Sequence, residues 1–481
     1  MKSKKKVQYL HFTNKDLDNI YDSGKKAATS FMRMIIDRIN QLESRIKELE
    51  DEKSKDSHNS NKPPSSDNPN RKPKSLRKKT GKKPGGQKNH KGSTLKQIDN
   101  PDKIKPIRLK GKCKCGKSLK LSKIVEIIKR QLFDIIISPL FVTEYQGEVR
   151  LCECGEYHYP TFPDYVKKEV QYGPTIKSLT AYLKHYGFLS YDRLAEFFKD
   201  VFGAKISQGT LVNFINECAE KVAPVVDEIK DDLIESEVCN FDETGFRIEG
   251  SRLWLHSAGT DYLTYYAPHE SRGHDAMEDI GILPFFKGTA IHDFWQSYYY
   301  FTKCEHGLCN QHHLRELVFF EEKGGKWAFK IKKHLLDLKK QIEEYKEFSS
   351  EKINKAIRKF RRLVYEGIKL NPEKIKKNKC RGRPPQSKEF NLLKRFKNRT
   401  DEVLRFILNP NVPFGNNRAE QDVRMTKIQQ KVSGSFRSMK GAESFCKIRS
   451  YISSIRKNGV SVFKALKSIW SGEILKPQKA E

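Results

Sequence analysis

The stretch "EVCNFDETG", residues 237–245, decides the fold that this sequence predicts. Its alternation indicates a β-strand that directs Asn240 and Asp242 to one face and Cys239 and Phe241 to the other. Because a strand fixes the direction of its side chains, the carboxylate of Asp242 is the first candidate for chemistry.

The segments that follow predict a small sheet around this strand. "RLWLHSAG" (252–259) and "YLTYYAP" (262–268) are expected as strands, "SRGHDAMEDIGILPFF" (271–286) as helical, and "GTAIHDFWQSYYYF" (288–301) as an apolar strand. A three-stranded meander, a crossover helix and a fourth strand parallel to the first would make Asp242 and Asp293 neighbours.

Two neighbouring carboxylates repel each other unless a divalent cation lies between them, as in two-metal sites of phosphoryl transfer. A third acid is offered by "FGNNRAEQDVRMTKIQQK" (414–431), where Glu420 shares one helical stripe with Arg424, Lys427 and Lys431. Glu420 would complete an oxygen ligand set for divalent cations, and Arg424, Lys427 and Lys431 could hold DNA phosphates.

A purely structural role for Glu420 is the alternative. Asn417 followed three residues later by Glu420 also matches a capping box, and Glu420 with Arg424 forms an ordinary i,i+4 pair.

Composition points to a polyanionic partner. The 481 residues contain 93 Lys and Arg against 60 Asp and Glu, a net charge of +33, and nucleic acid is the first partner to expect. No apolar run has membrane-spanning length, and the lysine-rich start becomes polar too soon for a secretory signal. A cytoplasmic protein associated with DNA is therefore expected, in a reducing compartment that favours metal-bound or buried cysteines.

The N-terminal segment has the a/d spacing of a coiled coil, which predicts self-association into a homo-oligomer. A solitary amphipathic helix is the alternative, because three heptads are short. The seam residues are Ala28, Met32, Ile35, Ile39, Leu42, Ile46 and Leu49.

A basic tract follows at residues 62–92, where eleven Lys and Arg face one Asp among five Pro and four Gly. This composition cannot build a core, so the tract either lies along DNA phosphates or is a solvated linker.

Two Cys-x-Cys-Gly turns, "CKCG" at 113–116 and "CECG" at 152–155, flank β-rich sequence. Four thiolates from paired turns suit structural Zn²⁺, although Cys-x-x-Cys is the commoner spacing and buried thiols are the alternative. The expected ligands are Cys113, Cys115, Cys152 and Cys154.

Residues 190–222 are similar to a helix-turn-helix, with a helix over 190–202, a turn at Gly203 and a second helix capped by Ser207. Such hairpins also occur in proteins that never bind DNA. If this one does bind DNA, its base-reading candidates are Gln208, Thr210 and Asn213.

The succession of coiled coil, "PPSSD", paired Cys turns, helical hairpin, "NFDETG", "AIHDFWQSYY", "LCNQHHLREL" and "NNRAEQDVR" resembles the insertion-sequence-sixty-six family of bacterial transposases over nearly the whole chain. The resemblance implies a DDE catalytic domain with an RNase H-like fold. It also implies that Asp242, Asp293 and Glu420 form the catalytic triad, with Mg²⁺ or Mn²⁺ as cofactor.

A further cluster has metal-like spacing and consists of Cys304, His306, Cys309, His312 and His313. In similar transposases a Cys-x-x-His follows the second Asp. Cys309 and His312 are therefore expected to pack or hydrogen-bond near the site, with a second zinc site as the alternative.

The segment between the second and third acids is too long for a simple loop. In residues 326–368 the apolar side chains recur at spacings of three and four residues, which predicts a pair of helices packed against each other. In the loop beyond it, "RGRPP" (381–385) resembles the core of a minor-groove hook, which would insert Arg381 and Arg383.

The sequence thus predicts a multidomain α+β protein. The expected parts are a helical oligomerisation segment (1–60), a basic linker (61–104), a zinc-binding-like β module (105–165), a helix-turn-helix region (166–235), an RNase H-like catalytic domain (236–445) with a helical insertion (about 325–400), and a helical tail (446–481). A transposase that cuts and joins element ends, with accessory proteins as further partners, is the expected function. A non-catalytic DNA-binding regulator and a nuclease without strand transfer are the alternatives.

Overall fold

The computed structural model describes residues 13–56, 58–60, 97–101, 103–107, 113–115, 118, 130–131, 140–151, 153–163, 166–345, 347–375 and 384–478. The chain divides into two compact units, which are described separately. Unit 1 comprises Met1–Leu76 and Thr289–Asn416, and unit 2 comprises Arg77–Gly288 and Asn417–Glu481.

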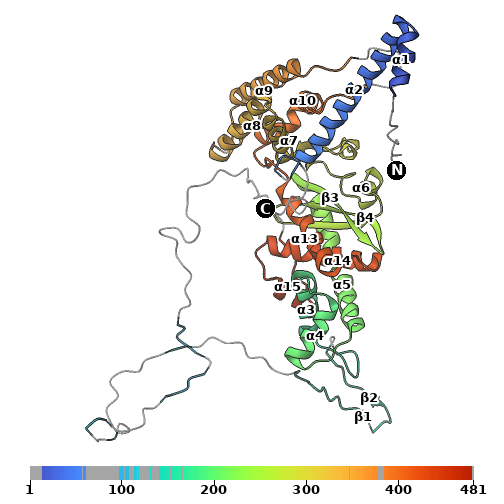
Figure 1. Ribbon diagram of the computed structural model, residues 1–481. Coiled ribbons are helices and arrows are strands. Elements are labelled where there is room, and N and C mark those ends of the chain that lie inside the picture. Colours follow the sequence, from blue (N-terminus) through green and yellow to red (C-terminus); the bar gives the residue numbers. More distant parts are fainter. Residues whose placement is uncertain are drawn as a thin grey trace. The chain divides into compact units, whose positions relative to one another are not determined.

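Unit 2 is built around an antiparallel meander of β3 (Val238–Ile248), β4 (Ser251–Gly259) and β5 (Thr264–His269). The meander confirms the three strands expected from the sequence, and Figure 1 shows it beside α13 and α14. The helix expected over 271–286 is much shorter, because α6 (His274–Ile280) ends at Gly281 in the left-handed conformation.

One face of this meander is covered by two helices from the C-terminal part of the chain. α13 (Asn417–Ser433) packs against β3 and β4, and α14 (Met439–Lys457) packs against β5. The apolar core between strands and helices consists of Phe246, Ile248, Leu253, Leu255, Tyr266, Ala442, Phe445 and Cys446. Burying one such side chain contributes about 1.5–3 kcal/mol, so this core holds α14 firmly on the sheet.

The helical hairpin of unit 2 follows the predicted boundaries closely. α4 (Tyr191–Phe202) ends at Gly203, whose φ of 69° is a left-handed cap, and α5 (Gln208–Ile234) begins after Ser207. The hydroxyl of Ser207 accepts the backbone N–H of Thr210 at 3.1 Å. The remaining elements of unit 2 are β1 (Arg150–Leu151), β2 (Tyr157–His158), α3 (Pro174–Ala181), a π-helical turn at Tyr182–Tyr186, and α15 (Val462–Ser468).

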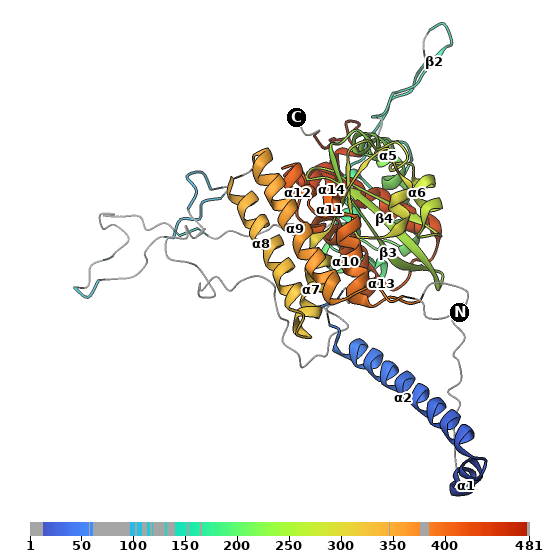
Figure 2. The same cartoon turned by 90° about the horizontal axis from the view of Figure 1, so that it is seen from above.

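Unit 1 contains a parallel strand pair, β6 (Thr289–His292) and β7 (Glu305–Leu308), joined by a 3₁₀ turn at Gln296–Tyr300. The predicted helical pair is present as α8 (Lys326–Tyr345) and α9 (Ser350–Leu370), which lie side by side in Figure 2. The other helices are α7 (Asn310–Glu322), α10 (Lys388–Asn398), α11 (Thr400–Val403) and α12 (Arg405–Leu408).

The N-terminal part of unit 1 is helical, with α1 (Asn14–Asp22) and the long α2 (Lys25–Ser54). The expected seam residues all lie on α2, and Met32, Ile39, Leu42, Ile46 and Leu49 are exposed. Within the described part of the chain, no helix has both the length and the apolar character that crossing a membrane requires.

Candidate active site

Asp242 lies in the middle of β3, on the sheet face that α13 and α14 cover. In the strand register Asp242 is opposite Ser257 on β4, and Ser257 is opposite Tyr266 on β5, a residue of the core beneath α14. The backbone N–H of Glu243 donates to Oδ1 of Asp242 at 2.9 Å. The half-buried carboxylate is therefore held in a fixed direction on the covered face.

α13 runs alongside β3 in the same direction. Three contacts set this alignment: the Tyr266 hydroxyl donates to the Asp422 carbonyl oxygen at 3.1 Å, the Lys427 amine donates to the Gly245 carbonyl oxygen, and Phe436 forms a parallel bridge with Ile248. Because Tyr266 shares the register row of Asp242, the first turns of α13 lie level with Asp242.

The two acids in the first turns of α13 lie on opposite flanks of the helix. Successive residues turn by about 100°, so Glu420 and Asp422 point about 200° apart. Lys427, on the flank of Glu420, contacts β3, whereas Asp422 contacts β5. The buried face between the two flanks contains Ala419, Val423, Thr426 and Gln429. Glu420 therefore projects from the flank nearest the strand that carries Asp242.

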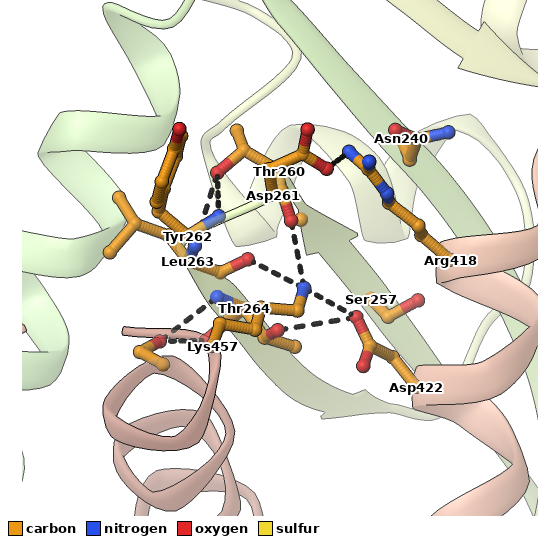
Figure 3. Close-up of polar contacts among 12 residues, drawn as sticks. Asn240, Ser257, Thr260, Asp261, Tyr262, Leu263, Thr264, Arg418, Asp422 and Lys457 are labelled. Carbon is orange, nitrogen blue, oxygen red and sulfur yellow. Dashed lines mark hydrogen bonds and ion pairs between the residues drawn. The ribbon is translucent and has the colours of Figure 1, made fainter. Parts of the chain in front are cut away.

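Asp422 is committed to a polar network on the β5 side (Figure 3). Its Oδ2 accepts from the amine of Lys457 at 2.9 Å and from the hydroxyl of Thr264 at 3.2 Å. Lys457 also donates to the carbonyl oxygens of Thr260 and Leu263, at 2.9 and 3.0 Å. Burial lowers the pKa of Lys457, and the charge of Asp422 works in the opposite direction.

The capping-box alternative for Glu420 depends on the first residues of α13. The helix begins at Asn417, so Asn416 occupies the N-cap position and Ala419 the third helical position. Glu420 is then the fourth helical residue, within the first turn, and the capping box stays a prediction. The neighbouring Arg418 pairs with Asp261, as Figure 3 shows.

Asp293 immediately follows β6 in unit 1. The strand ends at His292, which corrects the longer strand expected over 288–301. The cause is a turn in which Oδ1 of Asp293 accepts the backbone N–H of Trp295 at 2.9 Å, followed by the 3₁₀ turn. Asp293 thus lies at the carboxyl end of a parallel strand, a common position for functional side chains.

The residue before Asp293, His292, forms a hydrogen-bonded pair with His306, which the sequence analysis did not predict. Nε2 of His292 and Nδ1 of His306 are 3.0 Å apart, and the ring of His292 stacks on Tyr298 with centroids 4.3 Å apart. Burial lowers the pKa of His292 to about 3. The only sequence signal for His292 was its place next to Asp293.

The cysteines and histidines around β7 make packing and hydrogen-bond contacts in unit 1. Sγ of Cys309 accepts the backbone N–H of Asn416 at 3.1 Å, at the start of α7. His313 bonds to Asn310 at 3.2 Å, and Cys304 donates to the carbonyl oxygen of Phe301 at 3.4 Å. Burial, with Arg315 and Arg395 nearby, lowers the pKa of His312 to about 4.

The proposed zinc ligands are described only in part. Cys113, Cys115 and Cys154 are exposed, whereas Cys152 lies outside the described residues. Around Cys154 the chain forms the β1–β2 hairpin, and Gly155 has a φ of 89°, as expected for a glycine turn. Hydrogen bonds from Cys115 lower the pKa of the Cys113 thiol. Zinc binding remains a prediction.

The expected DNA-contact residues differ in how available they are. Arg424 and Lys431 are exposed on α13. At the start of α5 the Gln208 amide donates to Asp192 at 3.2 Å, and the Thr210 hydroxyl is 2.9 Å from that of Ser207, so local contacts engage both. Asn213 is exposed. The basic tract at 62–92, Arg381 and Arg383 lie outside the described residues.

Comparisons with known proteins bear on the same region. The family model described as "Transposase IS66 family" matches residues 169–444, and a family of unknown function, DUF6444, matches residues 18–96. No curated protein matches significantly.

Among solved structures, a chain of the simian T-cell lymphotropic virus intasome in complex with PP2A regulatory subunit B56 gamma is 12% identical, and the alignment covers 44% of this chain and 74% of that chain. The TM-score is 0.14, too low to support an argument about the fold.

Proposed function

Because this chain belongs to the IS66 family of transposases, we propose that it binds the ends of its mobile element, cuts the DNA there and joins the freed 3′-OH to target DNA. The proposed catalytic residues are Asp242, Asp293 and Glu420. They act as a DDE triad in an RNase H-like domain, with Mg²⁺ or Mn²⁺ as cofactor.

The observation that best supports this proposal is the alignment of α13 with β3. Two carboxylates that are far apart in the sequence, Asp242 and Glu420, come from facing elements of one unit, at the same level along the strand. The other nearby acid, Asp422, is bound to Lys457. We therefore propose Glu420 as the catalytic acid of α13 and a structural role for Asp422.

The donor set fits the proposed metal ions. Mg²⁺ and Mn²⁺ prefer carboxylate oxygens, and all three proposed ligands are Asp or Glu. When bound, these ions would neutralise charge on the phosphate and make a water molecule or a 3′-OH easier to deprotonate.

Contacts within the protein hold the proposed catalytic carboxylates in position. Glu243 fixes the Asp242 carboxylate through its backbone N–H, and the anchored α13 fixes Glu420. The exposed Arg424 and Lys431, with Lys427, would hold the phosphates of the strand that is cut.

The remaining parts of the chain are proposed to recognise element ends and to assemble copies of the protein. The exposed apolar positions of α2 suit a coiled coil with a second copy of the chain. The basic tract and the α4–α5 hairpin would contact element ends, and Zn²⁺ held by the four cysteines would stabilise the small β module. Accessory proteins of the same element are further candidate partners.

The test is an assay with labelled duplexes that carry the sequences flanking the gene, incubated with full-length protein. We expect cleavage at a fixed position and joined products in the presence of Mg²⁺, and neither after chelation. Cleavage without joined products would support the nuclease alternative, and end binding without cleavage would support the regulator.

A further inference from the structure

The hairpin that joins β3 to β4 places two arginines directly opposite each other. Arg247 and Arg252 are cross-strand partners, two residues before and two residues after the tight turn at Glu249 and Gly250. Like charges in directly opposite positions destabilise a strand pair. The free protein therefore carries an unfavourable contact at this tip, which an anionic ligand would relieve.

Within the described residues, no carboxylate forms an ion pair with Arg247 or Arg252. The acid on the same face of β3, Glu243, is already bound, because Arg272 donates to its Oε1 at 2.9 and 2.7 Å. The Glu243 side chain is 1% exposed. Both arginines are exposed, and among the described residues neither has an ion-pair partner that would neutralise it.

Packing restricts the direction of the Arg252 side chain. Its guanidinium lies 4.7 Å from the centroid of the Trp254 ring, so it is held by a cation–π contact. It also lies over Gly245, where an added Cβ would be 3.0 Å from Nε. A fixed guanidinium loses less conformational entropy when it binds a phosphate than a freely moving one.

A third cation lies close to this pair. The Lys427 amine donates to the carbonyl oxygen of Gly245, and its pKa is lowered by partial burial and by the charge of Arg252. Lys427 and Arg252 therefore lie close enough for their charges to interact, although Lys427 approaches β3 from the side of α13.

We propose that Arg247 and Arg252 form a phosphate-binding strip, which holds a DNA backbone near the tip of the β3–β4 hairpin, on the sheet face opposite to Asp242. The inference rests on the proposed function, since it takes DNA as the ligand. Each contact would neutralise one phosphate and release counterions, and would also remove the repulsion between the two arginines.

The experiment uses the full chain and a fluorescently labelled duplex of random sequence, titrated in EDTA at several salt concentrations. The double variant Arg247→Gln/Arg252→Gln is compared with Lys464→Gln/Lys467→Gln, which removes the same charge from exposed positions on α15 of the same unit. The slope of log affinity against log salt should fall by about 1.8 in the hairpin variant, since each lost contact removes about 0.9. The control slope should change much less.

Thermal unfolding without DNA supplies a second measurement. Arg247→Gln should keep or raise the unfolding midpoint, because it removes the like-charge contact. The phosphate-binding strip would be contradicted if the salt slope of DNA binding changed equally in the hairpin and control variants, or stayed unchanged in both. A wild-type protein that binds no DNA would instead reject the proposed function.

Discussion

Oδ2 of Asp422 and Nζ of Lys457 lie 2.9 Å apart, and this ion pair fastens the first turns of α13 to the end of α14. Both side chains are less than one-fifth exposed, at 16% and 18%. The ion pair lies on the flank of α13 opposite to Glu420. It therefore positions the helix without a part in the proposed DNA cleavage.

Breaking this pair from one side should be costly. Lys457→Met leaves a largely buried carboxylate without its cation, and we expect a loss of about 3 kcal/mol of unfolding free energy. Asp422→Asn combined with Lys457→Met should recover much of that loss, because no charge is then buried alone. Chemical denaturation of the three proteins checks this, and equal losses in single and double variants would show that the two residues are not coupled.

The stability of unit 2 should depend on pH through His256. Burial, aided by His269 and Arg272, lowers the pKa of His256 to about 4, whereas an unfolded histidine has a pKa near 6.5. Between these values the unfolded chain binds the extra proton, so this contribution is complete above about pH 6.5 and is lost as the pH falls towards 4. We expect on the order of 2 kcal/mol to be lost over this range.

His256→Gln is the matched variant for that prediction, since Gln can still donate towards the Ser271 carbonyl oxygen, which is 3.2 Å from Nε2 of His256. The difference between unfolding free energies at pH 7 and pH 4.5 should be smaller in the variant. The same difference in both proteins would assign the acid sensitivity to other groups.

The Cys-x-Cys turns should bind zinc. Metal analysis of purified protein is expected to find at least one Zn²⁺ per chain, and Cys113→Ser with Cys152→Ser should remove it and lower the thermal stability of the β module. If both zinc content and stability persist in the double variant, the cysteines are only thiols.

Removing residues 1–104 should leave a soluble core that self-associates and binds DNA less strongly. The coiled-coil seam and the basic tract both lie in the removed part. Light scattering should report a smaller particle, and the salt dependence of DNA binding should weaken. An unchanged salt slope would exclude the basic tract from the DNA contact.

Local patterns predicted the elements well where the determining groups are close in sequence. α4 and α5 follow from Ser190, Gly203 and Ser207, which cap helices through neighbouring backbone groups. The strand expected after Gly288 was longer than the observed β6. An apolar and aromatic run does not reveal that the chain turns at Asp293.

The ion pair of Asp422 with Lys457 was not predictable from the sequence. Both acids lie in the first turns of one helix, and only the tertiary packing of α13 on the meander distinguishes them. Lys457 lies 35 residues beyond Asp422, so no local spacing rule connects the two. The structure therefore adds the partner of Asp422, which the sequence could not supply.

The central claim is that Glu420, and not Asp422, is the acid of α13 that acts in catalysis. The measurement is Mg²⁺-dependent cleavage of a labelled element end by wild type, Asp242→Asn, Asp293→Asn, Glu420→Gln and Asp422→Asn, with end binding and folding measured in parallel. Glu420→Gln keeps nearly all of the side-chain volume, so we expect cleavage to collapse in the first three variants while binding and folding persist. Asp422→Asn should lose stability but keep cleavage under stabilising conditions. Near-normal cleavage by Glu420→Gln, beside an inactive but folded Asp422→Asn, would contradict the account.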